Sequence, residues 1–386
     1  MKQFWQAIAI LAGTTVGAGI LGIPYVVSQS GYLLGLIEII AIGLLMMVIN
    51  LYVAETALRT PGKHQLTGLA ERYLGKKGKI IMTIVTTFGI YGAMLAYLIG
   101  QSQVLSSIFG GNPAIYGIVY FAIMAGIIYA GLDLVEKADM FIIFANILLI
   151  GVISVLSFSK TNALNLLTFN PSNLLVPYGV ILFSYLATIS IPELKLALET
   201  HHHQIKKAVI LGTLIPMIIY ILFTTAVVGV VGFDKFSSLS PNERVATIAL
   251  GKYVPGSIAL VANLFAFFAM STAFISLGLA LKDTYHLDHK LKKGLAWGLT
   301  AFVPFAIWLV NTFVKELTDF IYTLNVVGVI SGGLTGIMVV LMVWKARKIG
   351  RREPEFKIGR SRLLGYLLIA IFALGMVYEL SRIIFA

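Results

Sequence analysis

The chain contains eleven apolar runs that are each long enough to cross a lipid bilayer, which takes about 20 residues. We place them at residues 4–28, 32–57, 79–107, 113–131, 138–158, 174–197, 205–232, 255–281, 294–312, 318–345 and 362–384. Of the 386 residues, 58% are hydrophobic and only 12% are charged, whereas soluble domains carry about 25% charged residues. The sequence therefore predicts an all-α polytopic membrane protein with eleven transmembrane helices, formed as a single membrane domain over residues 1–386.

The basic residues are divided unequally between the two sides of this predicted bundle. If the N-terminus is cytoplasmic, the segments on that side hold 23 of the 29 Lys and Arg residues. Positive charge concentrates in the cytoplasmic loops of membrane proteins. We therefore expect a multi-pass protein of the cytoplasmic (inner) membrane, with the N-terminus inside and the C-terminus outside. The net charge of +12 is explained by this topology, and we expect the lipid bilayer rather than a nucleic acid as its partner.

Residues 13–25, GTTVGAGILGIPY, place four glycines and one proline inside the first run. Residues 17–22 fit the pattern G-x-G-x-x-G, but that pattern binds dinucleotides only between a strand and a helix, and no such unit surrounds it. Gly13 and Gly17 also have the small-xxx-small spacing that lets membrane helices pack closely. The density of Gly and Pro favours a break in the helix over an intact packed helix, at a place where the backbone lines a cavity or is buried in protein.

The sixth run has a similar interruption. Residues 176–194, VPYGVILFSYLATISIPEL, carry a proline and polar side chains from the middle of the run to its inner end: Ser184, Tyr185, Thr188, Ser190 and Pro192. Many secondary transporters build their binding sites from broken helices in corresponding positions of two inverted repeats. We therefore expect a 5+5 inverted repeat, about 1–160 and about 170–346, followed by one additional helix at 361–385.

Several segments resemble one family of transporters. The segment AGTTVGAGILGIPY (12–25) closely resembles the first-span signature of the hydroxy/aromatic amino acid permeases (tryptophan/tyrosine permease-like), and GSGILG of the related amino acid/auxin permeases. Three later segments are similar to the same permeases in the same order: LTGLAERYLGKKGK (66–79), YGAMLAYLIGQSQVL (91–105) and FFAMSTAFISLGLAL (267–281). These families belong to the amino acid–polyamine–organocation superfamily, which has the LeuT-like inverted-repeat fold.

The resemblance implies a secondary active transporter, not an enzyme, that moves amino acids by alternating access. The implied substrate is an aromatic or another neutral amino acid, and the implied driving force is a gradient of H⁺ or Na⁺, with no cofactor. Backbone N–H groups in the first break would bind the substrate carboxylate at Gly17, Ala18 and Gly19, with help from the hydroxyls of Thr14 and Thr15. The sixth break would hold the ammonium group and the side chain with Ser184, Tyr185, Ala187 and Thr188.

The resemblance also assigns Tyr97, in the third run, to close over the substrate. The alternative role for any one of the 17 tyrosines is packing or a place in the interfacial belt. A sodium site in this fold would use the carbonyls of the first span and hydroxyls of the eighth, because hard cations prefer oxygen ligands. The corresponding residues are Gly13, Val16, Ser271 and Thr272. Relatives often have Thr-Ser where this chain has Thr-Ala at 272–273, and only a one-residue shift restores the second hydroxyl.

Proton coupling is the alternative to sodium coupling, and we favour it slightly. An acid inside a membrane span is costly and is usually paired or functional. Glu38 lies several residues inside the second run and is the candidate proton carrier, with snorkelling to the outer interface as its alternative role. Glu55 and Glu193 lie near cytoplasmic ends, where pairing with Arg59 in the next helical turn or contact with water explains them.

Other functions are less consistent with the sequence. The triplet His201–His203 lies in a cytoplasmic loop near only one acid, which favours a solvated loop over a metal site. A membrane-embedded enzyme would need a cluster of acids and histidines, or a nucleophile with its base, inside the spans. A channel would need a continuous polar lining. The paired breaks favour a transporter over both, while the oligomeric state and the identity of the amino acid are left open.

Overall fold

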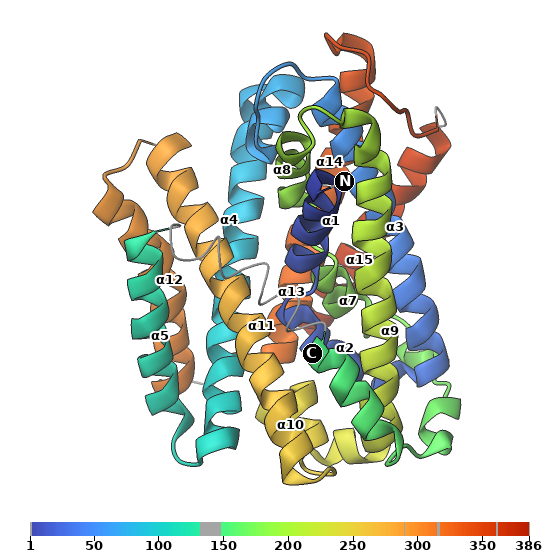
Figure 1. Cartoon of the computed structure of the whole chain (residues 1–386), viewed down its shortest axis with the longest axis vertical. Coiled ribbons are helices and arrows are strands. Elements are labelled where there is room, and N and C mark those ends of the chain that lie inside the picture. Colours follow the sequence, from blue (N-terminus) through green and yellow to red (C-terminus); the bar gives the residue numbers. More distant parts are fainter. Residues whose placement is uncertain (1, 132–147, 289, 315–316, 360–361, 386) are drawn as a thin grey trace.

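The structure, a computed structural model, describes residues 2–131, 148–288, 290–314, 317–359 and 362–385, and in these ranges it contains helices and loops but no strand (Figure 1). Nine helices in this part of the chain are long and apolar enough to cross a membrane. The interrupted first span, within residues 2–30, is not among these nine. The fifth predicted run, 138–158, lies partly outside the described residues, and its described part includes the apolar helix Leu148–Phe158.

The first half of the chain forms the elements that carry the first break. In chain order they are α1 (Lys2–Thr15), the 3₁₀ turn η1 (Ala18–Leu21), α2 (Ile23–Ser30), α3 (Tyr32–Leu58), α4 (Leu66–Phe109) and α5 (Pro113–Ala130). Pro113 stands in the first turn of α5, where its missing N–H has no helical partner to lose, and the Asn112 side chain accepts a hydrogen bond from the Ala114 N–H.

The second half of the chain contains a second broken helix. Two 3₁₀ turns, η3 (Ala163–Leu167) and η4 (Pro171–Asn173), precede the broken span, which consists of α7 (Tyr178–Ser184), η5 (Thr188–Ser190) and α8 (Ile191–Ala197). It is followed by η6 (His202–Gln204), α9 (Ile205–Ser238), η7 (Pro241–Glu243), α10 (Ala246–Gly251) and α11 (Gly256–Asp283). The chain ends with η8 (Thr284–Asp288), α12 (Lys293–Phe313), α13 (Phe320–Val327), the π-helical turn η9 (Gly328–Gly332), α14 (Gly333–Ile349) and α15 (Arg362–Phe385).

Two long helices bend at glycines that mark the limits of the predicted membrane runs. Gly75 in α4 has a φ of 74°, and Gly232 in α9 has a φ of 70°. Both values lie in the left-handed region that glycine adopts without steric cost. The apolar runs predicted at 79–107 and 205–232 therefore correspond to the membrane segments, and the parts of α4 before Gly75 and of α9 after Gly232 turn away from them.

The long helices α4 and α9 make many of the contacts in the bundle. Figure 1 shows α5 and α12 on one side of the molecule, α3 and α9 on the other, and α1 between them. The long α4 contacts α5, α11, α13 and α14, and α9 contacts α1, α2 and α3. Close helix crossings depend on glycine: a Cβ added to Gly328 would lie 1.9 Å from the carbonyl oxygen of Gly179, so the turn after α13 packs against the backbone of α7.

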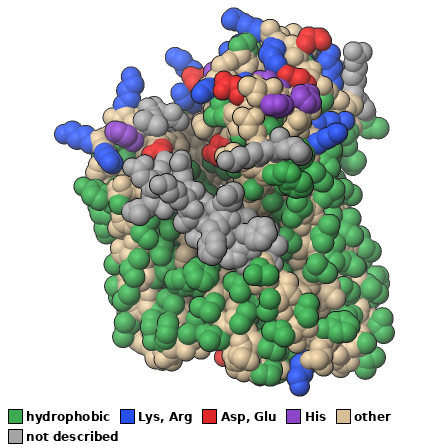
Figure 2. All heavy atoms as spheres, in the orientation of Figure 1, with side chains coloured by type: hydrophobic (Ala, Val, Ile, Leu, Met, Phe, Trp, Pro, Cys, Tyr) green, Lys and Arg blue, Asp and Glu red, His purple; other side chains and the backbone are tan. Residues whose placement is uncertain are grey.

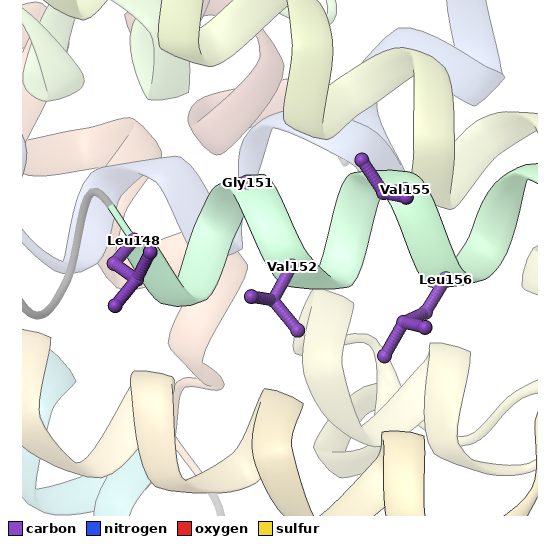
Figure 3. Close-up of a pocket in the computed structure, with 5 residues that line it drawn as sticks. All are labelled: Leu148, Gly151, Val152, Val155 and Leu156. Atoms are coloured by element: carbon purple, nitrogen blue, oxygen red, sulfur yellow. The ribbon is translucent and has the colours of Figure 1, made fainter.

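The surface agrees with a membrane environment. Figure 2 shows Lys, Arg and His side chains gathered at one end of the visible face, with hydrophobic side chains over the sides. Large apolar side chains on several of these helices are exposed, including Ile37 at 60%, Ile84 at 62% and Leu374 at 69%. An apolar depression along the helix Leu148–Phe158, lined by Leu148, Gly151, Val152, Val155 and Leu156 (Figure 3), offers no charged or hydroxyl group. It is therefore a poor candidate for an amino acid site.

The loop between α9 and α10 is held by polar contacts at one end of the bundle. The Ser240 N–H donates to the Glu243 carboxylate at 3.1 Å, and Lys252 Nζ lies 2.5 Å from the same carboxylate. The hydrogen bond from Lys252 lowers the pKa of Glu243 below its usual value. The Arg244 guanidinium lies over the Tyr25 ring, 4.9 Å from its centroid, and so links this loop to α2.

Candidate functional site

The first break separates α1 from η1. Val16 and Gly17 are not helical, and Gly17 has an extended backbone with φ −105° and ψ −154°. The Gly17 N–H donates to the Thr15 carbonyl oxygen at 2.8 Å, a local turn that replaces the helical pattern. The helix therefore breaks within the glycine-rich segment, where the sequence predicts it.

The second break separates α7 from η5 in the sixth span. The chain turns at Tyr185, and the Ala187 N–H donates to the Tyr185 carbonyl oxygen at 2.8 Å. Helical geometry resumes at Thr188. The break thus lies at the polar positions that the sequence singles out in this span.

The two breaks are in direct contact through Gly19 and Ser184. A Cβ added to Gly19 would lie 2.4 Å from Ser184 Oγ and 2.7 Å from Ser184 Cα. Atoms cannot approach so closely, so only glycine lets η1 rest against the end of α7. The Ser184 hydroxyl donates to the Val180 carbonyl oxygen at 2.8 Å.

Gly17 faces a different neighbourhood from Gly19. A Cβ added to Gly17 would lie 3.7 Å from the Ala273 Cβ and 3.9 Å from the Tyr97 hydroxyl, which are ordinary contact distances. Tyr97 belongs to α4 and is 4% exposed, and Ala273 belongs to α11. The structure therefore brings the first break together with the third and eighth spans, and it places Tyr97 beside the break.

The other predicted substrate side chains have partners elsewhere. The hydroxyls of Thr14 and Thr15 donate to carbonyl oxygens of their own helix, at Ile10 and Leu11, each at 2.7 Å. The hydroxyl of Tyr185 donates to the Ile39 carbonyl oxygen in α3 at 3.1 Å. The hydroxyl of Thr188 donates to Asn50 Oδ1, also in α3, at 3.1 Å. Ala187 is buried. The structure thus directs Tyr185 and Thr188 toward α3, and their role toward a substrate stays a prediction.

The two predicted sodium ligands of α11, Ser271 and Thr272, have different hydrogen-bond partners. The Thr272 hydroxyl donates to the Phe268 carbonyl oxygen at 2.9 Å. The Ser271 hydroxyl accepts from Gln101 Nε2 of α4 at 3.0 Å. Among the side chains of α11, that of Ala273 lies nearest to Gly17. Gly13 and Val16 lie in the last turn of α1 and just after it. The position that contacts the break therefore offers a methyl group and no hydroxyl.

The three acids have different environments. Glu38 is half-buried in α3, and its Oε2 is buried without a hydrogen-bond partner in the described part of the chain. Glu55 is fully buried and accepts hydrogen bonds from Arg59 Nη2 at 2.9 Å and Arg347 Nη2 at 2.7 Å. The predicted pairing with Arg59 is confirmed, and the structure adds Arg347. Glu193 is exposed in α8.

The histidine triplet lies among polar groups at the same end as Glu55. The ring Nδ1 of His201 is 3.2 Å from Gln3 Oε1, and His202 Nδ1 is 3.4 Å from Glu355 Oε1. Over the described residues, no group of three or more His, Asp and Glu side chains could hold a metal ion.

One residue at the breaks was missed by the sequence reasoning. Tyr220 of α9 is fully buried, and its hydroxyl lies 2.6 Å from the Thr15 carbonyl oxygen and 2.7 Å from the Ser184 carbonyl oxygen. These are the last residues of α1 and of α7. No feature of the sequence distinguishes Tyr220 from the other tyrosines of the apolar runs, because the contact joins segments far apart in the chain.

Residues 1–379 match the tryptophan/tyrosine permease family. The chain belongs to this family. Tyrosine-specific transport system 1 of Haemophilus influenzae is 25% identical and covers 98% of this chain and 96% of its own length. Glutamine transporter 2 of Aliivibrio fischeri is 24% identical over 72% of this chain and 74% of its own. Members of the family are transport proteins and not enzymes.

A solved structure has the same fold. The crystal structure of MhsT in complex with L-phenylalanine aligns with a TM-score of 0.69 at 13% sequence identity, covering 96% of each chain. MhsT has the LeuT fold, with which the two broken spans and the helical architecture described above agree. The family membership and the apolar helices together identify a multi-pass membrane protein.

Proposed function

We propose that this protein is a secondary active transporter that carries an aromatic or another neutral amino acid across the cytoplasmic membrane by cation-coupled alternating access. The observation that carries the proposal is the meeting of two helix breaks at Gly19 and Ser184, with Tyr97 beside the first break at Gly17. Broken helices tolerated in the membrane interior are a means of building a substrate site. The family membership and the bound phenylalanine of MhsT support an amino acid as the substrate.

The two breaks divide the recognition of an amino acid between them. Backbone N–H groups at Gly17, Ala18 and Gly19 bind the substrate carboxylate, as such groups bind anions elsewhere. For Gly17 this requires its N–H to leave the Thr15 carbonyl oxygen, to which it donates at 2.8 Å in this structure. Carbonyl oxygens of the sixth-span break bind the ammonium group. Tyr97 closes over the bound substrate from α4. The names of the relatives, which include tyrosine and glutamine transporters, support a neutral side chain over a charged one.

The packing on the two sides of the breaks supports a state that is open toward the cytoplasm. On the outer side, a Cβ added to Gly22 would lie 2.8 Å from Val180 and 3.0 Å from Leu324, so apolar side chains of α7 and α13 close over the first span. On the other side, Thr14 and Glu193 are exposed. If the N-terminus lies inside the cell, these two exposed positions lie on the cytoplasmic side of the breaks, which supports this state.

The surroundings of Glu38 and Ala273 favour H⁺ over Na⁺ as the coupling ion. The α11 residue that contacts the first break is alanine, and the nearby hydroxyls of Ser271 and Thr272 are engaged with Gln101 and with α11 itself. Glu38, in contrast, has a buried carboxylate oxygen without a partner among the described residues. The next residue, Ile39, accepts the Tyr185 hydroxyl, which connects Glu38 to the sixth-span break.

Counterflow tests the transport function and ranks substrates. Proteoliposomes preloaded with one unlabelled amino acid are placed in labelled tryptophan, and uptake of the label is measured. We expect exchange with preloaded tryptophan, tyrosine, phenylalanine or glutamine, and no exchange with lysine or aspartate. Failure of every neutral amino acid to drive exchange, from protein shown to be folded by size-exclusion chromatography, would contradict the proposal.

The substitution Glu38→Gln tests proton coupling. We expect the variant to lose accumulation driven by an acidic exterior by about tenfold or more, while counterflow at equal pH continues, because exchange requires no net proton movement. Glu193→Gln, which changes an exposed acid near the cytoplasmic end, is the matched control and should keep both activities. Accumulation that requires Na⁺ and survives in Glu38→Gln would identify sodium as the coupling ion instead.

A further inference from the structure

Tyr220 joins the ends of the two broken helices. Its hydroxyl lies within hydrogen-bond distance of the Thr15 carbonyl oxygen, at 2.6 Å, and of the Ser184 carbonyl oxygen, at 2.7 Å. Both carbonyls belong to the last helical residue before a break, where the regular hydrogen-bond pattern of the helix ends. Thr15 and Ser184 are themselves buried, so water is a poor substitute for the tyrosine as donor.

The chemistry of the phenol makes this contact sensitive to the relative position of the breaks. A phenol has one proton, so it donates to one carbonyl at a time or shares the proton between both. Buried carbonyl groups without a donor are costly. The Thr15 carbonyl oxygen also accepts from the Gly17 N–H at 2.8 Å, so a shift of one helix end away from the other costs most when the Ser184 carbonyl loses the tyrosine. A joint shift of both ends with α9 keeps the contact.

The surroundings of Tyr220 hold its ring in place. The ring packs edge-to-face against Tyr185, with centroids 5.1 Å apart and an interplanar angle of 67°. The α9 helix that carries Tyr220 contacts α1, α2 and α3. A movement of α9 would therefore act on the first span through packing and on the sixth span through the Tyr185 ring and the Ser184 carbonyl.

We propose that Tyr220 is a positioning residue that makes the first-span and sixth-span breaks change conformation together during transport. This inference rests on the proposed transport function. Tyr220 itself does not bind the substrate: its hydroxyl is occupied by the two carbonyls, and its side chain is fully buried between the broken helices.

The test uses cysteine reporters, because the natural chain contains no cysteine. Thr14→Cys places a reporter in α1 and Glu193→Cys places one in α8, both at exposed positions of the two broken spans. Each reporter is introduced separately, and its rate of maleimide labelling in proteoliposomes is measured against tyrosine concentration. In the otherwise natural protein we expect both reporters to respond with the same half-maximal tyrosine concentration.

The substitution Tyr220→Phe should separate the two responses. We expect half-maximal tyrosine concentrations that differ at least about fivefold between reporters, and counterflow slowed by about tenfold, which corresponds to the loss of one buried hydrogen bond. Tyr73→Phe is the matched control. It removes a buried hydroxyl that is hydrogen-bonded to the Thr60 hydroxyl at 2.7 Å. Neither residue belongs to a broken span, so both reporters should still respond together.

Three outcomes overturn the inference. Reporters that respond together in folded Tyr220→Phe show that the hydroxyl does not couple the breaks. If that variant does not fold, replacement of Tyr220 by para-aminophenylalanine supplies two N–H donors for the two carbonyls. If the two reporters have different half-maximal tyrosine concentrations in the folded amino variant, the inference is also overturned. Equal half-maximal concentrations in that variant support the inference. Absence of counterflow in the natural chain instead refutes the transport function, and the inference with it.

Discussion

Alanine at position 19 is expected to stop counterflow and to destabilise the protein. The new Cβ would lie 2.4 Å from Ser184 Oγ and 2.7 Å from Ser184 Cα, so the two breaks must separate. Overpacking of this kind costs about 1–3 kcal/mol, and here the displaced groups also form the proposed substrate site. The measurements are labelled tryptophan counterflow and thermal unfolding in detergent micelles, followed by tryptophan fluorescence.

Two other glycines provide matched controls for Gly19→Ala. A Cβ at Gly17 would make only ordinary contacts, the nearest at 3.7 Å, and a Cβ at Gly126 would meet nothing within 4 Å. Gly17→Ala should therefore fold with nearly natural stability and yet transport poorly, because the methyl group occupies the space between the break and Tyr97. Gly126→Ala should change neither property. Equal stability of the position-19 and position-126 variants would contradict the close contact of the breaks.

The second-site substitution Ser184→Gly refines this prediction. It removes the Oγ and Cβ atoms that a Cβ at position 19 would meet at 2.4 Å and 2.8 Å, but it leaves the Ser184 Cα at 2.7 Å. The double variant should therefore regain part of the lost stability and little of the transport. Complete recovery would show that the side chain of Ser184, and not its backbone, limits the approach of the two helices.

Local sequence patterns predicted those features of the fold that depend on local chemistry. Apolar runs marked the membrane helices because the bilayer sets a minimum length for them. Glycine density marked the first break, and the polar run around Ser184 marked the second. The limits of the third and seventh runs agree with Gly75 and Gly232, where the backbone adopts a positive φ.

The contacts between distant segments could not be predicted in this way. The approach of Gly19 to Ser184, the position of Tyr220 between two carbonyls and the pairing of Glu55 with Arg347 all join residues more than 30 positions apart. Hydrophobic periodicity describes which face of a helix is buried, but not which neighbour covers it. This is also why Thr188 and Tyr185, predicted beside the substrate, direct their hydroxyls toward α3.

Replacement of Glu55 by glutamine is expected to destabilise the protein strongly, because it changes a buried ion pair at the charged end of the bundle. The Glu55 carboxylate is fully buried, and it accepts from Arg59, from Arg347 and from the Ile358 N–H at 3.1 Å. Glutamine keeps the shape but removes the negative charge, which leaves two guanidinium groups side by side. Breaking a buried ion pair costs about 3–5 kcal/mol. We expect a loss of stability near the lower end of this range, because the Arg59 and Arg347 side chains are 11% and 18% exposed and water can partly solvate them.

The matched control is Glu71→Gln, which removes an acid from the exposed pair with Lys79, whose side chains are 44% and 37% exposed. Exposed pairs contribute about 0–1 kcal/mol, so this variant should unfold near the natural temperature. A double-mutant cycle with Arg347→Gln isolates the pairwise coupling. Because the double variant removes one of the two unbalanced cations, its loss of stability should be smaller than the sum of the losses in the two single variants. Additive losses would mean that α3 and the end of α14 are held together by packing and not by this carboxylate.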